Sequence, residues 1–174
     1  MRFKAPGFAA ITIMAAIAMG QHVRPQVKTG LWEQTITITR QGALPMPESV
    51  LSKLTPEQRA RVEAQMGASQ QPRTITHQEC LTEKDLDHFD IFEGPDPNCR
   101  QTVQSSTGTQ IDTQWECKID EGITGKGTMH IDILSAENAR GTSHTVVDGN
   151  GQHMVTDSKM TSKWIGSDCG KMHR

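Results

Sequence analysis

The chain has 174 residues, a formal net charge of −2 and only 4% aromatic residues. Its Lys and Arg residues are scattered, which argues against nucleic-acid binding, since that function needs basic clusters and usually aromatic side chains that stack on bases. The length suits a single domain with one modest apolar core.

The start of the chain has the pattern of a secretory signal peptide. Arg2 and Lys4 precede an uncharged apolar run over residues 8–19 that ends in small residues. A helix needs about twenty apolar residues to cross a bilayer, so this run is too short for a membrane span. Cleavage after Ala18 or after Gly20 fits the small-residue rule equally well. The alternative is a buried N-terminal helix.

This pattern predicts the organisation of the chain. We expect a signal peptide over 1–20, a flexible N-terminal segment over 21–29, one disulfide-bonded β domain over 30–170 and a tail over 171–174. The mature protein is then periplasmic or secreted, with no transmembrane anchor.

Four cysteines lie in the exported part, where disulfides are permitted. Two extended segments meet at Gly108, between two threonines. A three-residue loop there places Ser106 opposite Gln110. Seven residues back along each strand, Cys99 then lies opposite Cys117, at a separation that a disulfide can span.

The remaining cysteines, Cys80 and Cys169, are left to pair with each other, and their bridge would close a long loop. Pairing Cys80 with Cys99 and Cys117 with Cys169 remains open. No Cys-x-x-Cys and no zinc-ligand spacing occurs, so the cysteines indicate structural disulfides.

Alternating apolar and polar residues predict strands. Ile111, Thr113 and Trp115 alternate with Asp112 and Gln114, and this period of two is typical of a half-buried strand. The same pattern recurs between turn signals from Cys99 onward, and strands near 31–39 and 73–79 precede it. We expect a mainly β fold with minor α: a curved antiparallel up-and-down meander, or half-barrel, of about seven strands with a covering helix.

Two helices are expected. A capping box with proline at the first helical position, Thr55-Pro56-Glu57-Gln58, predicts a helix over 55–66, on the rim of the sheet or across one opening. A shorter helix follows Thr82, with Leu86 and Phe89 facing inward.

The inward side of the sheet is rich in Met and Trp. Such side chains serve either as core or as the lining of an apolar ligand site. The candidate ligand face consists of Trp32, Trp115, Met129, Met154, Met160 and Trp164.

Histidines give one further hint of chemistry. A turn at Asp148-Gly149 would place His144 opposite His153, as a candidate metal pair, whereas a turn at Asn150-Gly151 would separate them. No nucleophile elbow, phosphate loop or His-Glu-x-x-His motif occurs. The sequence therefore predicts no cofactor and no catalytic residue.

Several short motifs carry a resemblance that covers nearly the whole mature chain: Gly30-Leu31-Trp32, Thr55-Pro56-Glu57-Gln58-Arg59, Glu79-Cys80-Leu81-Thr82, the Cys99–Cys117 hairpin and Lys163-Trp164-Ile165-Gly166-Ser167-Asp168-Cys169. Together they resemble the exported bacterial family known as domain of unknown function 3617. The resemblance implies a signal-bearing, periplasmic protein with paired cysteines and supplies no activity.

Two functional hypotheses follow from the sequence. The first is a non-catalytic envelope protein that binds an apolar small molecule or a protein partner through its curved sheet. The second is an enzyme or metal-binding protein with an unrecognised site, for which titratable groups would have to gather in a deep cleft.

Overall fold

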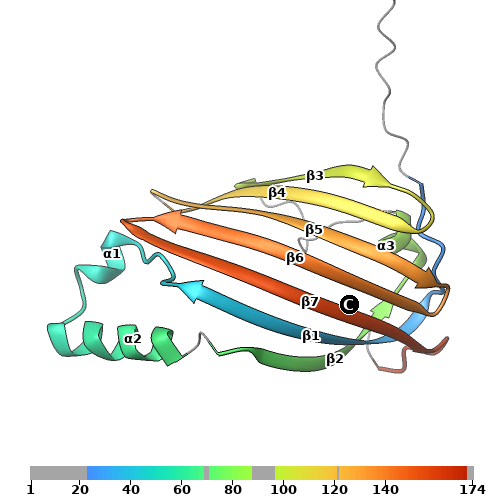
Figure 1. Cartoon of the computed structure of the whole chain (residues 1–174), viewed down its shortest axis with the longest axis horizontal. Helices are drawn as coiled ribbons and strands as arrows, with labels where there is room; N and C mark the ends of the chain where they lie inside the picture. The colour runs from blue at the N-terminus through green and yellow to red at the C-terminus, as the bar shows by residue number, and fades with distance from the viewer. Residues whose placement is uncertain (1–22, 69–70, 88–96, 121, 172–174) are drawn as a thin grey trace, which may run out of the picture.

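The computed structural model describes residues 23–68, 71–87, 97–120 and 122–171. Seven antiparallel strands form one open sheet in the order β2-β1-β7-β6-β5-β4-β3 (Figure 1). The strands are β1 (Gly30–Gly42), β2 (Arg73–Leu81), β3 (Cys99–Ser106), β4 (Gln110–Asp120), β5 (Ile123–Ser135), β6 (Asn138–Gly149) and β7 (Gln152–Gly166). The mainly β, antiparallel, seven-stranded prediction is confirmed.

Strands β3 to β7 form an up-and-down meander in which each strand pairs with the next. The first two strands extend the sheet beyond β7, because β1 pairs with β7 and β2 pairs with β1. The N-terminal hairpin is thereby added to the last strand of the meander. The sheet keeps two outer strands, β2 and β3.

Three helices lie between strands in the described part of the chain: α1 (Glu48–Leu51), α2 (Pro56–Ala68) and α3 (Glu83–Asp87). The predicted capping box at the start of α2 forms, since Thr55 N donates to Gln58 Oε1 and Gln58 N donates to Thr55 Oγ1. Figure 1 shows α2 beyond the end of the sheet, at its rim. Within the described ranges, no helix combines the length and the hydropathy of a membrane span.

The expected short helix is α3, which begins directly after Thr82. Asp85 accepts hydrogen bonds from the backbone N and the hydroxyl of Thr82, which fixes the start of the helix. Leu86 on this helix is buried, as predicted. Phe89 lies outside the described residues.

Two disulfides join Cys99 to Cys117 and Cys80 to Cys169, the pairing that the hairpin argument favours. The loop differs from the predicted one, because Ser106 pairs with Ile111 rather than with Gln110. The register shifts between Val103 and Ser105, so that residue 104 is an extra residue on β3. This bulge offsets the longer loop, and the cysteines still lie opposite each other.

The sheet has one apolar and one polar face. On the apolar face, a cross-strand row of Ile36, Met160, Gly141, Ile131 and Ile111 runs from β1 to β4. The most buried hydrophobic side chains include Trp32, Ile111, Ile123, Ile131 and Val147. The other face carries Thr, His, Asp and Lys side chains from alternate positions of the same strands.

Candidate functional site

Residues 23–29, which precede β1, form backbone hydrogen bonds with two turns of the sheet. Gln26 N donates to Gly108 O at 3.1 Å, and Lys28 N donates to Ala136 O at 2.9 Å. Pro25 is buried. We call residues 23–29 the strap, since these bonds tie it to the β3–β4 and β5–β6 turns.

Two tryptophans hold the end of the strap. Trp32 Nε1 donates to Lys28 O at 2.9 Å, and Trp164 Nε1 donates to Thr29 O at 3.0 Å. The Lys28 ammonium lies 4.4 Å from the centroid of the Trp164 ring, within reach of a cation–π interaction. Both indole N–H groups are therefore used to fix the strap.

An apolar cavity of about 110 Å³ lies between the strap, α3 and the apolar face. Its apolar lining is Pro25, Val27, Trp32, Leu81, Leu86, Ile111, Ile131, Ile133, Ala139 and Met160. Four polar or acidic side chains also line it: Gln34, Glu79, Asp85 and Ser162. Gln34 Nε2 donates to the Glu79 carboxylate. The cavity can accept the apolar end of a small molecule, and Glu79 and Asp85 are the acidic residues of its lining.

The six residues of the candidate ligand face share one side of the sheet, as their register positions show. Only two of them, Trp32 and Met160, line this cavity. Sequence reasoning placed Trp32, Met160 and Leu86 on the inward side but did not name Pro25 or Val27. Their alternation just before β1 is the signal that could have identified them.

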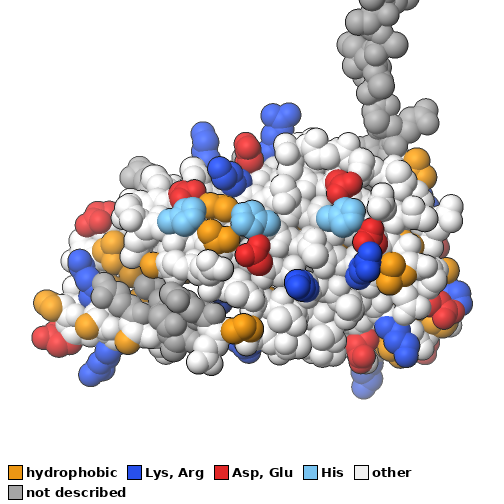
Figure 2. All heavy atoms as spheres, viewed as in Figure 1, with side chains coloured by type: hydrophobic (Ala, Val, Ile, Leu, Met, Phe, Trp, Pro, Cys, Tyr) orange, Lys and Arg blue, Asp and Glu red, His pale blue; other side chains and the backbone are white. Residues whose placement is uncertain are grey.

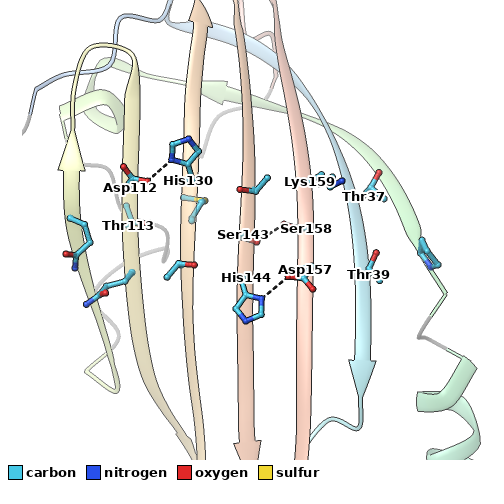
Figure 3. Close-up of a pocket in the computed structure, with 16 residues that line it drawn as sticks. Thr37, Thr39, Asp112, Thr113, His130, Ser143, His144, Asp157, Ser158 and Lys159 are labelled. Atoms are coloured by element: carbon cyan, nitrogen blue, oxygen red, sulfur yellow. Dashed lines mark hydrogen bonds and ion pairs between the residues drawn. The ribbon is translucent and has the colours of Figure 1, made fainter.

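The polar face carries a groove of about 770 Å³ (Figure 3). Two cross-strand rows of side chains line it, and they run from β1 to β4. The first row is Thr37, Lys159, Thr142, His130 and Asp112, and the second is Thr39, Asp157, His144, Thr128 and Gln114. With Gln104 of β3 it crosses six strands, so at about 4.8 Å per strand it is about 24 Å long.

His130 is the centre of a charged cluster at one end of this groove. Its Nδ1 lies 2.6 Å from Asp112 Oδ1, and its Nε2 lies 3.1 Å from Asp132 Oδ1. The hydrogen bond to Asp112 raises the pKa of His130, and the bond to Asp132 adds to this rise. Arg140 Nε donates to Asp132 Oδ2 at 2.9 Å.

The carboxyls of this cluster shift in the opposite direction. The Ser105 hydroxyl, followed by His130, lowers the pKa of Asp112 by hydrogen bonding. Hydrogen bonds from Arg140 and Gln110 lower the pKa of Asp132. Both carboxyls therefore favour the ionised form, which complements a protonated His130.

The candidate metal pair does not form. The turn lies at Asn150-Gly151, where both residues have positive φ, so His144 pairs with Asp157 and His153 with Asp148. His144 Nδ1 lies 2.8 Å from Asp157 Oδ1. The structure thus contradicts a cross-strand His144–His153 site.

Other titratable side chains of the described residues do not form a metal site either. In the part of the chain that the structure describes, no three His, Cys, Asp or Glu side chains are placed to hold a metal ion. Figure 2 shows the histidines of this face spread across its surface.

Comparison with known proteins identifies a family. Residues 27–169 match the family described as Protein of unknown function (DUF3617). No curated protein and no solved structure matches the chain.

Proposed function

Because the chain belongs to the DUF3617 family, whose function is unknown, we propose from its structure that it is an exported, non-catalytic binding protein for a small apolar molecule. The observation that carries the proposal is the cavity of about 110 Å³ beneath the strap. Ligand sites are mostly apolar with a few placed polar groups, and this lining has that composition. An apolar cavity of about 150 Å³ stays dry and binds benzene, so a slightly smaller one accepts the end of an alkyl chain.

The side chains beside the cavity define the rest of the ligand. Glu79 and Asp85 are the acidic residues of the lining, and like charges repel in a site of low dielectric constant. The ligand is therefore an uncharged or cationic amphiphile rather than a fatty acid. Gln34 and Ser162 supply hydrogen-bonding groups for its polar end.

Calorimetric titration of the mature protein with 1-octanol and with octanoate tests this proposal. We expect saturable binding of 1-octanol and at least tenfold weaker binding of octanoate. Ala139→Leu adds bulk to the lining and should abolish binding. Ala136→Leu makes the same change at an exposed turn position and should leave binding unchanged. No binding of 1-octanol, or equal binding by both variants, would refute the proposal.

Export is part of the proposal. It is supported by the signal-like residues 1–20 and by two disulfides, which persist in oxidising compartments. Fractionation of cells that express the full chain should place it in the periplasm or medium. Its mass should match a chain that begins at residue 19 or 21. A full-length product in the cytoplasm with free thiols would contradict export.

The polar groove favours a second candidate, the binding of an extended polyhydroxylated chain such as a glycan. Its volume of about 770 Å³ falls within the size range of ligand sites. Its lining combines hydroxyls with acidic and basic groups that largely balance, as in Asp112 with His130 and Asp157 with Lys159. Such a lining offers both donors and acceptors to sugar hydroxyls.

Backbone amide spectra recorded with neutral hexasaccharides of glucose and N-acetylglucosamine test this candidate. Shifts should follow the two rows of the groove and disappear in Thr142→Trp, which places bulk between them. Thr161→Trp, on the neighbouring strand β7 and on the same face of the sheet but outside the groove lining, is the matched control. If no hexasaccharide causes shifts at these rows, the glycan candidate is refuted.

A further inference from the structure

The two outer strands of the sheet differ in how their free edges are protected. β3 carries the bulge at residue 104, and next to its end the Ser106 hydroxyl donates to Val23 O of the strap at 2.7 Å. Bulges and covering segments are the usual means by which a protein blocks pairing at an edge. β3 is thus protected against another strand.

Among the described residues, β2 has neither a bulge nor a covering segment at its outer edge. It pairs with β1 alone, and Figure 1 shows it along the lower border of the sheet. Its register with β1 runs without a bulge from Leu81 to Arg73, and residues 73–78 are all exposed. Ile75, a large hydrophobic residue, is 36% exposed. A regular, exposed edge of this kind is a template for another strand.

The usable edge has clear limits. Pro72, which has no backbone N–H to donate, directly precedes β2. At the other end, the disulfide from Cys80 ties the C-terminal segment to the strand. Seven residues, 73–79, lie between these limits, and their midpoint is Thr76.

The sequence of this edge is complementary to itself. If two copies pair antiparallel about Thr76, Arg73 of each lies opposite Glu79 of the other. Both residues occupy alternate positions on the same face of the sheet, because their β1 neighbours are Ile38 and Trp32. Thr74 then lies opposite Gln78, and Ile75 opposite His77. Opposite charges on directly opposed residues stabilise an antiparallel pair, whereas like charges destabilise it.

We propose that β2 is a self-association edge, at which two copies of the chain pair antiparallel about Thr76 into one continuous sheet with two Arg73–Glu79 ion pairs. This edge adjoins both ligand sites, because Glu79 also lines the cavity beneath the strap and Pro72 also lines the groove. One pair of short strands buries far less area than a standard interface. The dimer is therefore weak and depends on concentration.

A cysteine placed on the two-fold axis tests the register. The described cysteines are all in disulfides, so Thr76→Cys adds one new thiol, and mild oxidation should link most of the protein as a dimer on a non-reducing gel. Thr74→Cys, on the same strand and face, should stay monomeric because it lies opposite Gln78. Monomeric Thr76→Cys, or equal linkage in both variants, would overturn the proposal.

Charge reversal provides the second test. Arg73→Glu and Glu79→Arg each place like charges opposite each other, so neither variant should self-associate in analytical ultracentrifugation. An equimolar mixture restores two opposite-charge pairs and should form a heterodimer. Circular dichroism checks that both variants are folded. If folded variants associate no better when mixed than when alone, the proposal is wrong.

Discussion

The indole ring of Trp115 fills the space in which a side chain at residue 127 would stand. A Cβ atom built on Gly127 would lie 2.7 Å from both Cε2 and Nε1 of that ring. The two residues are cross-strand partners on the apolar face, on β4 and β5. Glycine at this position thus lets the large ring lie flat against the sheet.

This contact predicts the effect of one added methyl group. Gly127→Ala forces the ring or the strand to move, and overpacking of this kind costs about 1–3 kcal/mol in the free energy of unfolding. Chemical denaturation measures it. Gly166→Ala, where a Cβ would have nothing within 4 Å, is the control and should change stability little. Equal stability of both variants would show that Trp115 does not pack as described.

The two disulfides should differ in their contributions. Cys80–Cys169 spans 89 residues and Cys99–Cys117 spans 18. In the chain-entropy model, the longer loop contributes about 4–5 kcal/mol and the shorter about 3 kcal/mol. Denaturation of C80S/C169S and of C99S/C117S should show the larger loss in the first. The opposite order would contradict the loop-entropy explanation.

Thr113 is buried on the apolar face with 2% of its surface exposed, and its hydroxyl lacks a hydrogen-bond partner among the described residues. A buried unsatisfied hydroxyl destabilises the folded state. Thr113→Val should therefore raise the free energy of unfolding by about 1 kcal/mol. The exposed Thr142→Val should change it by less than about 0.5 kcal/mol. A clear destabilisation by Thr113→Val would mean that the hydroxyl is satisfied.

The His130–Asp112 pair should make stability depend on pH. A raised folded-state pKa of His130 gives a contribution that is present below its unfolded pKa, about 6.5, and is lost as pH rises through the folded value. A lowered pKa of Asp112 gives a contribution present above about pH 3.9 and lost as pH falls through the folded value. The pair therefore contributes most to the free energy of unfolding between about pH 3.9 and about pH 6.5.

Unfolding free energies at pH 5.5 and at pH 8 measure this effect. Between pH 5.5 and pH 8, the unfolding free energy of the wild-type protein should fall by more than that of His130→Gln. An NMR titration of the ring should give a pKa above the ordinary value for histidine. A ring that titrates below that value would contradict the hydrogen bond to Asp112.

Local patterns predicted much of the fold. The alternation of Trp115 with its polar neighbours identified β4, and the cysteine spacing identified the hairpin. The loop was wrong by one residue because the bulge at residue 104 leaves no mark in an alternating pattern that is already polar. The Asn150-Gly151 turn was one of two open alternatives, and positive φ at both residues decides between them.

The site was less predictable because it depends on contacts between distant segments. The strap bonds to the turns at Gly108 and Ala136, which lie about a hundred residues away. Nothing in the local sequence around Pro25 indicates that this segment bonds to those two turns. The groove likewise depends on the register of six strands, and sequence alone left the β6–β7 register open.

Methyl NMR of the mature protein, labelled at Met and Ile, can detect ligand in the cavity directly during titration with 1-octanol. We expect saturable shifts at Met160, Ile131 and Ile133, which line the cavity, and none at Met154, which shares the face but lies outside it. No shift at the three cavity methyls at saturating 1-octanol, or shifts at Met154 alone, would contradict an apolar site beneath the strap.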